Sequence, residues 1–175
     1  MNMKNIATKF FLLLVLCSGV VSSCKKDKTT PTNNNTNNNN NTASCQDGYV
    51  CLKLNGTDIS KPGSGYYFSD TSCFIKYEEG AVQLSMDIFG NTAQSYTVGD
   101  VRQIGRGRIY YFPDNASQFM SHSGTLTVTE MTSDKKISGT FSAKLYKYNA
   151  NSSTYDFSDS MEITNGSFNK IQLVQ

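Results

Sequence analysis

Residues 125–129 read TLTVT, and residues 137–145 read ISGTFSAKL. In the first, Leu126 and Val128 alternate with threonines, which is the period of two expected of a β-strand with one buried face. Apolar residues recur with the same spacing in the second, where Gly139 indicates a close approach or a bulge. Both stretches therefore predict strands.

The same period runs through most of residues 45–175. Val50, Leu52 and Leu54 alternate with less apolar residues, and the Asn55-Gly56 pair that follows is a strong signal for a tight hairpin turn. Near the end of the chain the alternation changes phase at Asn165 and Gly166, which predicts a bulge or a tight turn. Further short runs are bounded by turn residues and lie at 66–68, 73–77, 82–89, 95–98 and 109–112.

About nine short strands without a helical stretch predict an all-β domain, either an antiparallel β-sandwich or a partly open β-barrel. The alternation leaves the choice between these two open. The predicted core consists of the inward-facing apolar residues Val50, Leu52, Leu54, Ile75, Leu84, Met86, Ile88, Leu126, Val128, Ile137, Phe141, Leu145, Ile163, Phe168 and Ile171.

Residues 1–23 are predicted to be a signal peptide, with a basic start, an apolar run and a small-residue end. The apolar run is shorter than the roughly 20 residues that a membrane span needs. The end of this segment, Val21-Ser22-Ser23-Cys24, resembles the lipobox of bacterial lipoproteins, in which the cysteine is lipidated. A lysine directly after the cysteine, here Lys25, resembles the lipoproteins of Gram-negative bacteria that are sorted to the outer membrane. The domain is expected on either the periplasmic or the cell-surface side of that membrane. An ordinary secretory signal with an incidental cysteine is the alternative.

Residues 24–44 are expected to form a disordered linker, because the Asn- and Thr-rich sequence offers almost no apolar surface to bury. Residues 45–175 then have the length of a single domain. The chain carries 16 basic and 14 acidic residues, but Lys4 and Lys9 leave with the signal peptide, so the charges of the mature chain balance. This charge balance does not favour a nucleic-acid partner.

Three cysteines of the domain are expected to meet an oxidising compartment, where cysteines pair. A Cys45–Cys51 disulfide is the first choice, because Asp47 and Gly48 indicate a turn between the two; Cys51–Cys73 is the alternative. The spacing matches no zinc pattern, so no metal site is expected.

His122 is the only histidine. With Ser121 or Ser123 and an acid such as Asp114 it suggests a hydrolase, but no Gly-x-Ser-x-Gly motif accompanies it, and an exposed loop histidine is the preferred interpretation. The acids Asp156, Asp159 and Glu162 are read as a solvated hairpin instead of a glycosidase pair. We therefore expect no catalytic residues and no cofactor.

Arginines and aromatic residues gather between residues 102 and 112, where Arg102, Arg106 and Arg108 lie near Tyr110, Tyr111 and Phe112. They suggest a binding surface; the alternative is that some of them belong to the core or to an edge strand, on which charged residues discourage aggregation. Alternation predicts that Tyr111 faces away from its two aromatic neighbours. The two Gly-x-Gly pairs, 63–65 and 105–107, do not lead into helices and are expected to be turns.

Residues 137–141 (ISGTF) and 162–168 (EITNGSF) are similar to strands of small all-β lipoproteins of Bacteroidota, an uncharacterised family. The likeness extends over most of residues 45–175. It implies an all-β fold and an envelope location, and it implies no catalytic residue. The expected function is a non-enzymatic binding or structural role, anchored to the membrane through Cys24, with an envelope protein or a glycan as partner. A barrel-type carrier of a small apolar ligand is the alternative, followed by a hydrolase.

Overall fold

The computed structural model describes residues 45–69 and 71–175. The predicted signal peptide, Cys24 and the linker up to residue 44 lie outside the described residues. In the described part, ten strands form one sheet. The strands are β1 (Tyr49–Leu54), β2 (Thr57–Pro62), β3 (Ser64–Ser69), β4 (Ser72–Glu79), β5 (Val82–Ile88), β6 (Ser95–Val98), β7 (Arg106–Phe112), β8 (Phe119–Met131), β9 (Lys136–Asn149) and β10 (Thr154–Val174).

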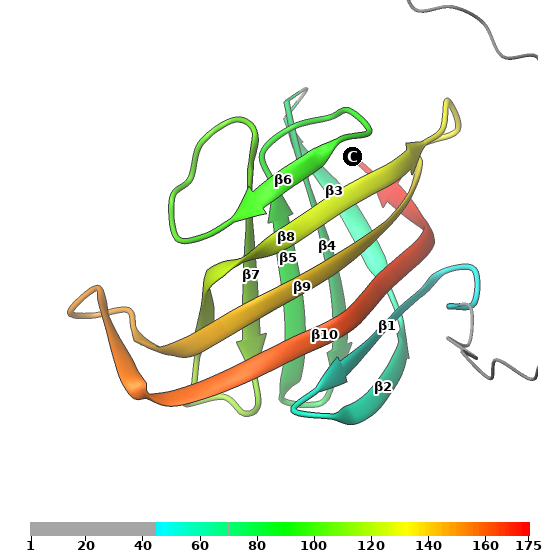
Figure 1. Ribbon diagram of the computed structural model, residues 1–175. Helices are drawn as coiled ribbons and strands as arrows, with labels where there is room; N and C mark the ends of the chain where they lie inside the picture. The colour runs from blue at the N-terminus through cyan, green and yellow to red at the C-terminus, as the bar shows by residue number, and fades with distance from the viewer. Residues whose placement is uncertain (1–44, 70) are drawn as a thin grey trace, which may run out of the picture. The chain divides into compact units, whose positions relative to one another are not determined.

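The sheet folds over on itself into two layers, with β6, β8, β9 and β10 crossing in front of β3, β4, β5 and β7 (Figure 1). Strand pairing continues around both sides of this arrangement, because β10 pairs with β9 and β3 while β7 pairs with β5 and β8. Most pairs are antiparallel; the pairs β10–β3 and β6–β7 are parallel. The all-β prediction is therefore confirmed, and the arrangement is one sheet whose pairings close into a ring.

The predicted Asn55-Gly56 turn joins β1 to β2. Both residues have positive φ angles, 48° for Asn55 and 83° for Gly56, which is the backbone conformation of the tight hairpin turn that this pair favours. The turn is also attached to β10, because the Asn55 side chain accepts a hydrogen bond from the Glu162 amide at 2.8 Å. The sequence pattern did not predict β2, because its residues TDISKP are mostly exposed and show no apolar alternation.

The apolar core fills the space between the two layers. All predicted core residues are buried except Leu54, which is half-buried where β1 reaches the β1–β2 turn. The sequence did not single out the tyrosines of this core, which are Tyr77, Tyr96 and Tyr111. Their ring carbons pack like those of any large apolar residue, but the hydroxyl group makes tyrosine common on surfaces as well.

The long strand β10 bends at three register shifts against β9. One lies between Ile163 and Gly166, where Asn165 has a φ of 51°, so the predicted phase change is a bulge inside a continuous strand. Gly139 on β9 is a close approach, since an added Cβ would lie against the Thr127 carbonyl and 2.5 Å from the Phe168 ring. Bends of this kind let one strand serve both layers.

Two predictions from the sequence, one for β7 and one for the Gly-x-Gly pairs, were wrong. β7 is not an edge strand, because it pairs with β5 on one side and with β6 and β8 on the other. The Gly-x-Gly pairs are not simply turns either, because Gly65 lies inside β3 and Gly107 inside β7. At Gly65 an added Cβ would lie 2.5 Å from Leu173, so the glycine admits the end of β10 beside β3.

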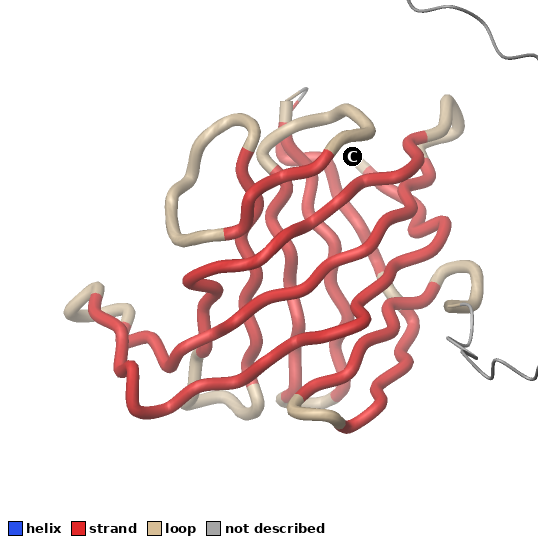
Figure 2. Tube along the Cα trace, in the orientation of Figure 1, coloured by secondary structure: helices blue, strands red, loops and turns tan. Residues whose placement is uncertain are grey.

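Loops occupy the ends of the strands, and the β9–β10 hairpin extends beyond the neighbouring strands (Figure 2). Within residues 45–69 and 71–175 the structure contains no helix with the length and apolarity of a membrane span.

Candidate binding surface

A row of side chains crosses β7, β8 and β9 on the outer side of the sheet. Tyr110 lies opposite Met120, and Met120 lies opposite Tyr146. The chain neighbours Phe119 and Leu145 belong to the core, so alternation places the row on the outer face. Met120 is nevertheless only 5% exposed, which means that further groups cover it from outside.

Tyr146 of this row also belongs to an outer aromatic cluster, which comprises His122, Tyr146, Tyr148, Tyr155 and Phe157. The His122 ring meets three of the other rings edge to face, with centroids 5.7 Å from Tyr146, 5.5 Å from Tyr155 and 5.4 Å from Phe157. Tyr146 and Phe157 are 4.9 Å apart, and Tyr148 lies 5.2 Å from Tyr155. Edge-to-face contacts at such distances are favourable aromatic geometry.

The cluster is attached to a buried, hydrogen-bonded base at Ser121. Tyr155 Oη donates a hydrogen bond to the Ser121 carbonyl at 3.3 Å, and burial raises the pKa of Tyr155. Ser121 Oγ is fully buried, where it accepts a bond from the Ile109 amide at 3.0 Å and donates one to the Gly99 carbonyl at 3.2 Å. The side of the cluster away from this base is open, because Phe157 is 62% exposed.

Three of the hydrolase candidates, Asp114, Ser121 and His122, make structural contacts. Asp114 Oδ1 accepts the amides of Ala116 at 2.7 Å and Ser117 at 2.6 Å, and these bonds lower the pKa of Asp114. The Ser121 hydroxyl is hydrogen-bonded to the Ile109 amide and the Gly99 carbonyl. The His122 ring contacts the rings of Tyr146, Tyr155 and Phe157. In residues 45–69 and 71–175 no group of three or more His, Cys, Asp and Glu residues is arranged to hold a metal ion.

The predicted arginine and aromatic surface on β7 divides as alternation requires. Tyr111 is buried, while Tyr110 and Phe112 stack on the outer face with centroids 6.2 Å apart. Arg108 pairs with Asp87 at 2.9 Å and lies 4.8 Å from the centre of the Tyr110 ring. Burial raises the pKa of Tyr110 to about 12. This half of the outer face is therefore held together by a half-buried ion pair.

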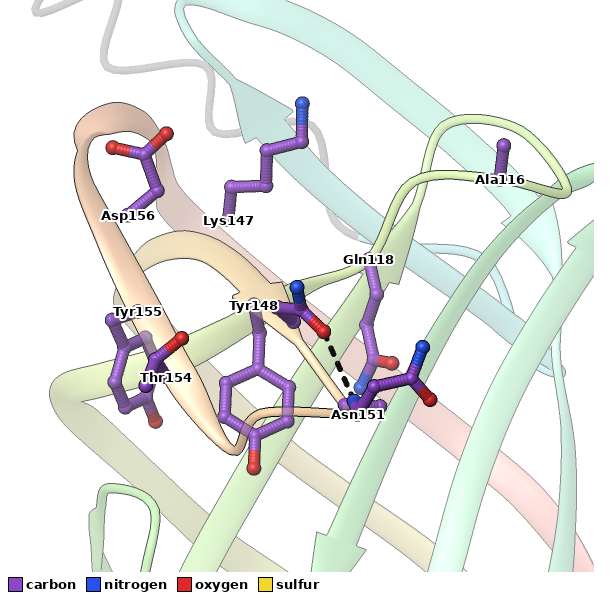
Figure 3. Close-up of a pocket in the computed structure, with 10 residues that line it drawn as sticks. Ala116, Gln118, Lys147, Tyr148, Asn151, Thr154, Tyr155 and Asp156 are labelled. Carbon is purple, nitrogen blue, oxygen red and sulfur yellow. Dashed lines mark hydrogen bonds between the residues drawn. The ribbon is translucent and has the colours of Figure 1, made fainter.

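The β9–β10 hairpin forms one side of a groove of about 520 Å³. Three cross-strand pairs build this side: Asn149 with Thr154, Tyr148 with Tyr155, and Lys147 with Asp156. The β7–β8 loop supplies Ala116 and Gln118. Figure 3 shows Tyr148, Tyr155 and Gln118 on one side of the hairpin, with Lys147 and Asp156 on the other. We call this the hairpin groove; it shares Tyr148 and Tyr155 with the outer aromatic cluster.

The cysteines have separate positions. Cys45 and Cys51 are joined by a disulfide with their Cα atoms 5.8 Å apart, the pairing that the sequence favoured. The alternative partner Cys73 is a free thiol within the core, and burial raises its pKa to about 12. A thiol in this state is not a nucleophile near neutral pH.

Comparisons of the chain with known protein families, with curated proteins and with solved structures found no match.

Proposed function

We propose that the chain is an exported lipoprotein, anchored to the outer membrane through Cys24, whose β domain binds an envelope or extracellular partner without catalysing a reaction. The observation that carries the binding role is the outer aromatic cluster. Five rings from three strands gather on the outer face, and one of them, Phe157, is mostly exposed. Aromatic residues are enriched in binding surfaces because they bury much area with little loss of side-chain freedom.

The packing of the core supports this choice over the carrier. A carrier needs space inside the fold for its ligand, whereas core side chains occupy the region between the layers, with Ile75, Leu84 and Leu145 at zero exposure. The groove at the β9–β10 hairpin is lined by residues near the ends of β9 and β10 and by the β7–β8 loop, so it lies outside the core. We therefore assign the binding role to the outer face.

The test uses a Cys24→Ala chain as a soluble probe. It is incubated with washed envelopes of the source bacterium, and the bound fraction is measured by sedimentation over a range of concentrations. We expect saturable binding that falls about 10-fold or more for Phe157→Ser, since truncating a central aromatic residue of an interface costs about 2 kcal/mol.

Phe68→Ser is the matched control, because Phe68 on β3 is 59% exposed, nearly the same as Phe157. We expect it to bind like the parent chain. The unsubstituted chain should instead remain in the membrane fraction and carry fatty acid on its Cys24 peptide in a mass spectrum. Equal binding by the Phe157 and Phe68 variants would refute the role of the cluster.

A further inference from the structure

The hairpin groove combines two kinds of chemistry in one row. The Tyr148 amide donates to the Gln118 carbonyl at 2.8 Å, which continues the register of Phe119 opposite Lys147, and Tyr155 pairs with Tyr148 on the other side. Gln118, on the β7–β8 loop just before β8, therefore lies in a row with Tyr148 on β9 and Tyr155 on β10 (Figure 3). An amide next to two aromatic rings presents hydrogen-bonding groups and an apolar face to the same ligand.

The side chains that line the groove differ in whether they already have hydrogen-bond partners within the protein. The Tyr155 hydroxyl is already bonded to Ser121, and Asn149 Oδ1 accepts the amides of Asn151 and Ser152. Among the described residues, the side-chain amides of Gln118 and Asn151 have no hydrogen-bond partner, and both line the groove. The groove thus offers two amides with unused donors and acceptors beside the Tyr148 ring.

The two charged residues that line the groove, Lys147 and Asp156, have opposite signs and lie opposite each other on β9 and β10. Lys147 lies 3.5 Å from Asp159. Asp156 Oδ1 accepts bonds from the Ser158 hydroxyl at 2.6 Å and the Ser158 amide at 3.0 Å, and these bonds lower the pKa of Asp156. One cation and one anion line the groove, and each has a partner, so nothing in it selects a charged ligand.

From this combination we infer that the hairpin groove binds a neutral oligosaccharide. A sugar ring has an apolar C–H face that stacks on Tyr148 and a rim of hydroxyl groups that exchange hydrogen bonds with the amides of Gln118 and Asn151. The groove volume of about 520 Å³ lies within the range of roughly 300–1,000 Å³ typical of small-ligand sites. This inference rests on the proposed binding function and names the ligand class of that surface.

The experiment measures binding of the soluble Cys24→Ala chain to defined oligosaccharides by calorimetry. The panel contains linear oligomers of glucose, xylose, mannose and N-acetylglucosamine, with oligogalacturonate as the acidic comparison. We expect saturable binding of at least one neutral oligomer and weaker binding of the acidic one. Binding of none of the neutral oligomers, or equal binding of the acidic one, would overturn the inference.

Variants at Tyr148 test the stacking. Tyr148→Ala is expected to weaken binding about 10-fold, which corresponds to about 1.4 kcal/mol, whereas Tyr148→Phe keeps the ring face and should stay within about threefold. Tyr66→Ala is the matched control, because Tyr66 on β3 also stacks on a neighbouring ring, Phe74, at 5.3 Å. Thermal melts establish that each variant is folded. A folded Tyr148→Ala chain that binds like its parent would contradict the site.

Treated envelopes separate this inference from the proposed function. Periodate cleaves the vicinal diols of glycans, and protease removes exposed protein. Binding lost after periodate but kept after protease supports the oligosaccharide. Binding that is lost only after protease, still depends on Phe157 and is not inhibited by any neutral oligomer of the panel would refute the oligosaccharide and leave the proposed binding function standing, with a protein as partner.

Discussion

At the scale of single residues, two buried tyrosines differ in what their hydroxyl groups contact. Tyr77 Oη is buried and has no hydrogen-bond partner among the described residues, whereas Tyr96 Oη donates to the Thr92 carbonyl at 2.7 Å. Tyr77→Phe is expected to raise the free energy of unfolding by about 1 kcal/mol, because it removes an unsatisfied polar group. Tyr96→Phe should lower it by about 1 kcal/mol, because it removes a made bond.

Urea unfolding followed by circular dichroism measures both changes. The two tyrosines control for each other, since their exposures are 2% and 1% and the substitution is the same. A loss of stability for Tyr77→Phe as large as that for Tyr96→Phe would show that the Tyr77 hydroxyl has a partner in solution.

The difference between aliphatic residues and tyrosines explains which core residues the sequence could predict. Aliphatic positions such as Val128 and Ile163 were identified because an aliphatic residue at every second position has a single interpretation, burial. Tyrosine at alternate positions has two interpretations, burial or exposure, since Tyr111 is buried while Tyr146 on β9 faces outward. Which face a tyrosine takes follows from the register of its strand, and no single strand sequence contains that register.

At the scale of elements, the β1–β2 hairpin depends on its turn. Asn55 both adopts a positive φ and binds β10 through Glu162. Asn55→Ala is expected to lose about 1 kcal/mol and to speed amide hydrogen exchange in β1, β2 and at Glu162, while β4 and β5 keep their protection. Hydrogen exchange read by mass spectrometry checks this outcome.

Lys53→Ala is the control for that hairpin. It removes only an ion pair with Asp58, whose side chain is 81% exposed, and such surface pairs contribute little. Exchange should therefore stay close to that of the parent chain. Acceleration spread evenly over all strands in Asn55→Ala would mean that the hairpin does not open as a separate unit.

The outer aromatic cluster shows what element-level patterns leave out. Its members come from β8, β9 and β10, and two register shifts lie beside them, between Ser121 and Ser123 and between Asp156 and Ser160. Each shift changes which face the following residues take. The sequence predicted that His122 is exposed and lies in a loop; it is exposed, but the loop assignment was wrong, because His122 lies within β8. Its three ring contacts depend on shifts that the alternation does not locate. The phase change at Asn165 was visible only because aliphatic residues flank it on both sides.

At the scale of the whole molecule, the proposed anchor and the binding surface place different demands on the domain. The linker after Cys24 is expected to set only the reach of the domain, so the rigidity of the binding surface must come from the fold. The structure provides it through the Ser121 bonds beneath the cluster and the Arg108–Asp87 pair beside it. The stability of the core and the geometry of the surface are therefore coupled.

The buried thiol and phenol groups predict how the stability of the fold changes at alkaline pH. Burial raises the pKa of Cys73 from 9.0 to about 12 and that of Tyr110 from 10.0 to about 12, and it also raises the pKa of Tyr77 and Tyr155. The folded chain therefore holds these protons more tightly than the unfolded chain does. Their contribution to stability is fully present below the unfolded pKa values and is lost as the pH rises through the folded ones.

The urea midpoint should accordingly stay level up to about pH 8.5 and fall continuously from about pH 9 to pH 11. In Cys73→Ala the fall should begin about one pH unit later, near the ordinary pKa of tyrosine, because the group that ionises first in the unfolded chain has been removed. The cavity left by the smaller side chain lowers stability at every pH, so the onset of the fall carries the information and the absolute midpoint does not. A midpoint that is constant to pH 11 would mean that solvent reaches these buried groups in the folded state.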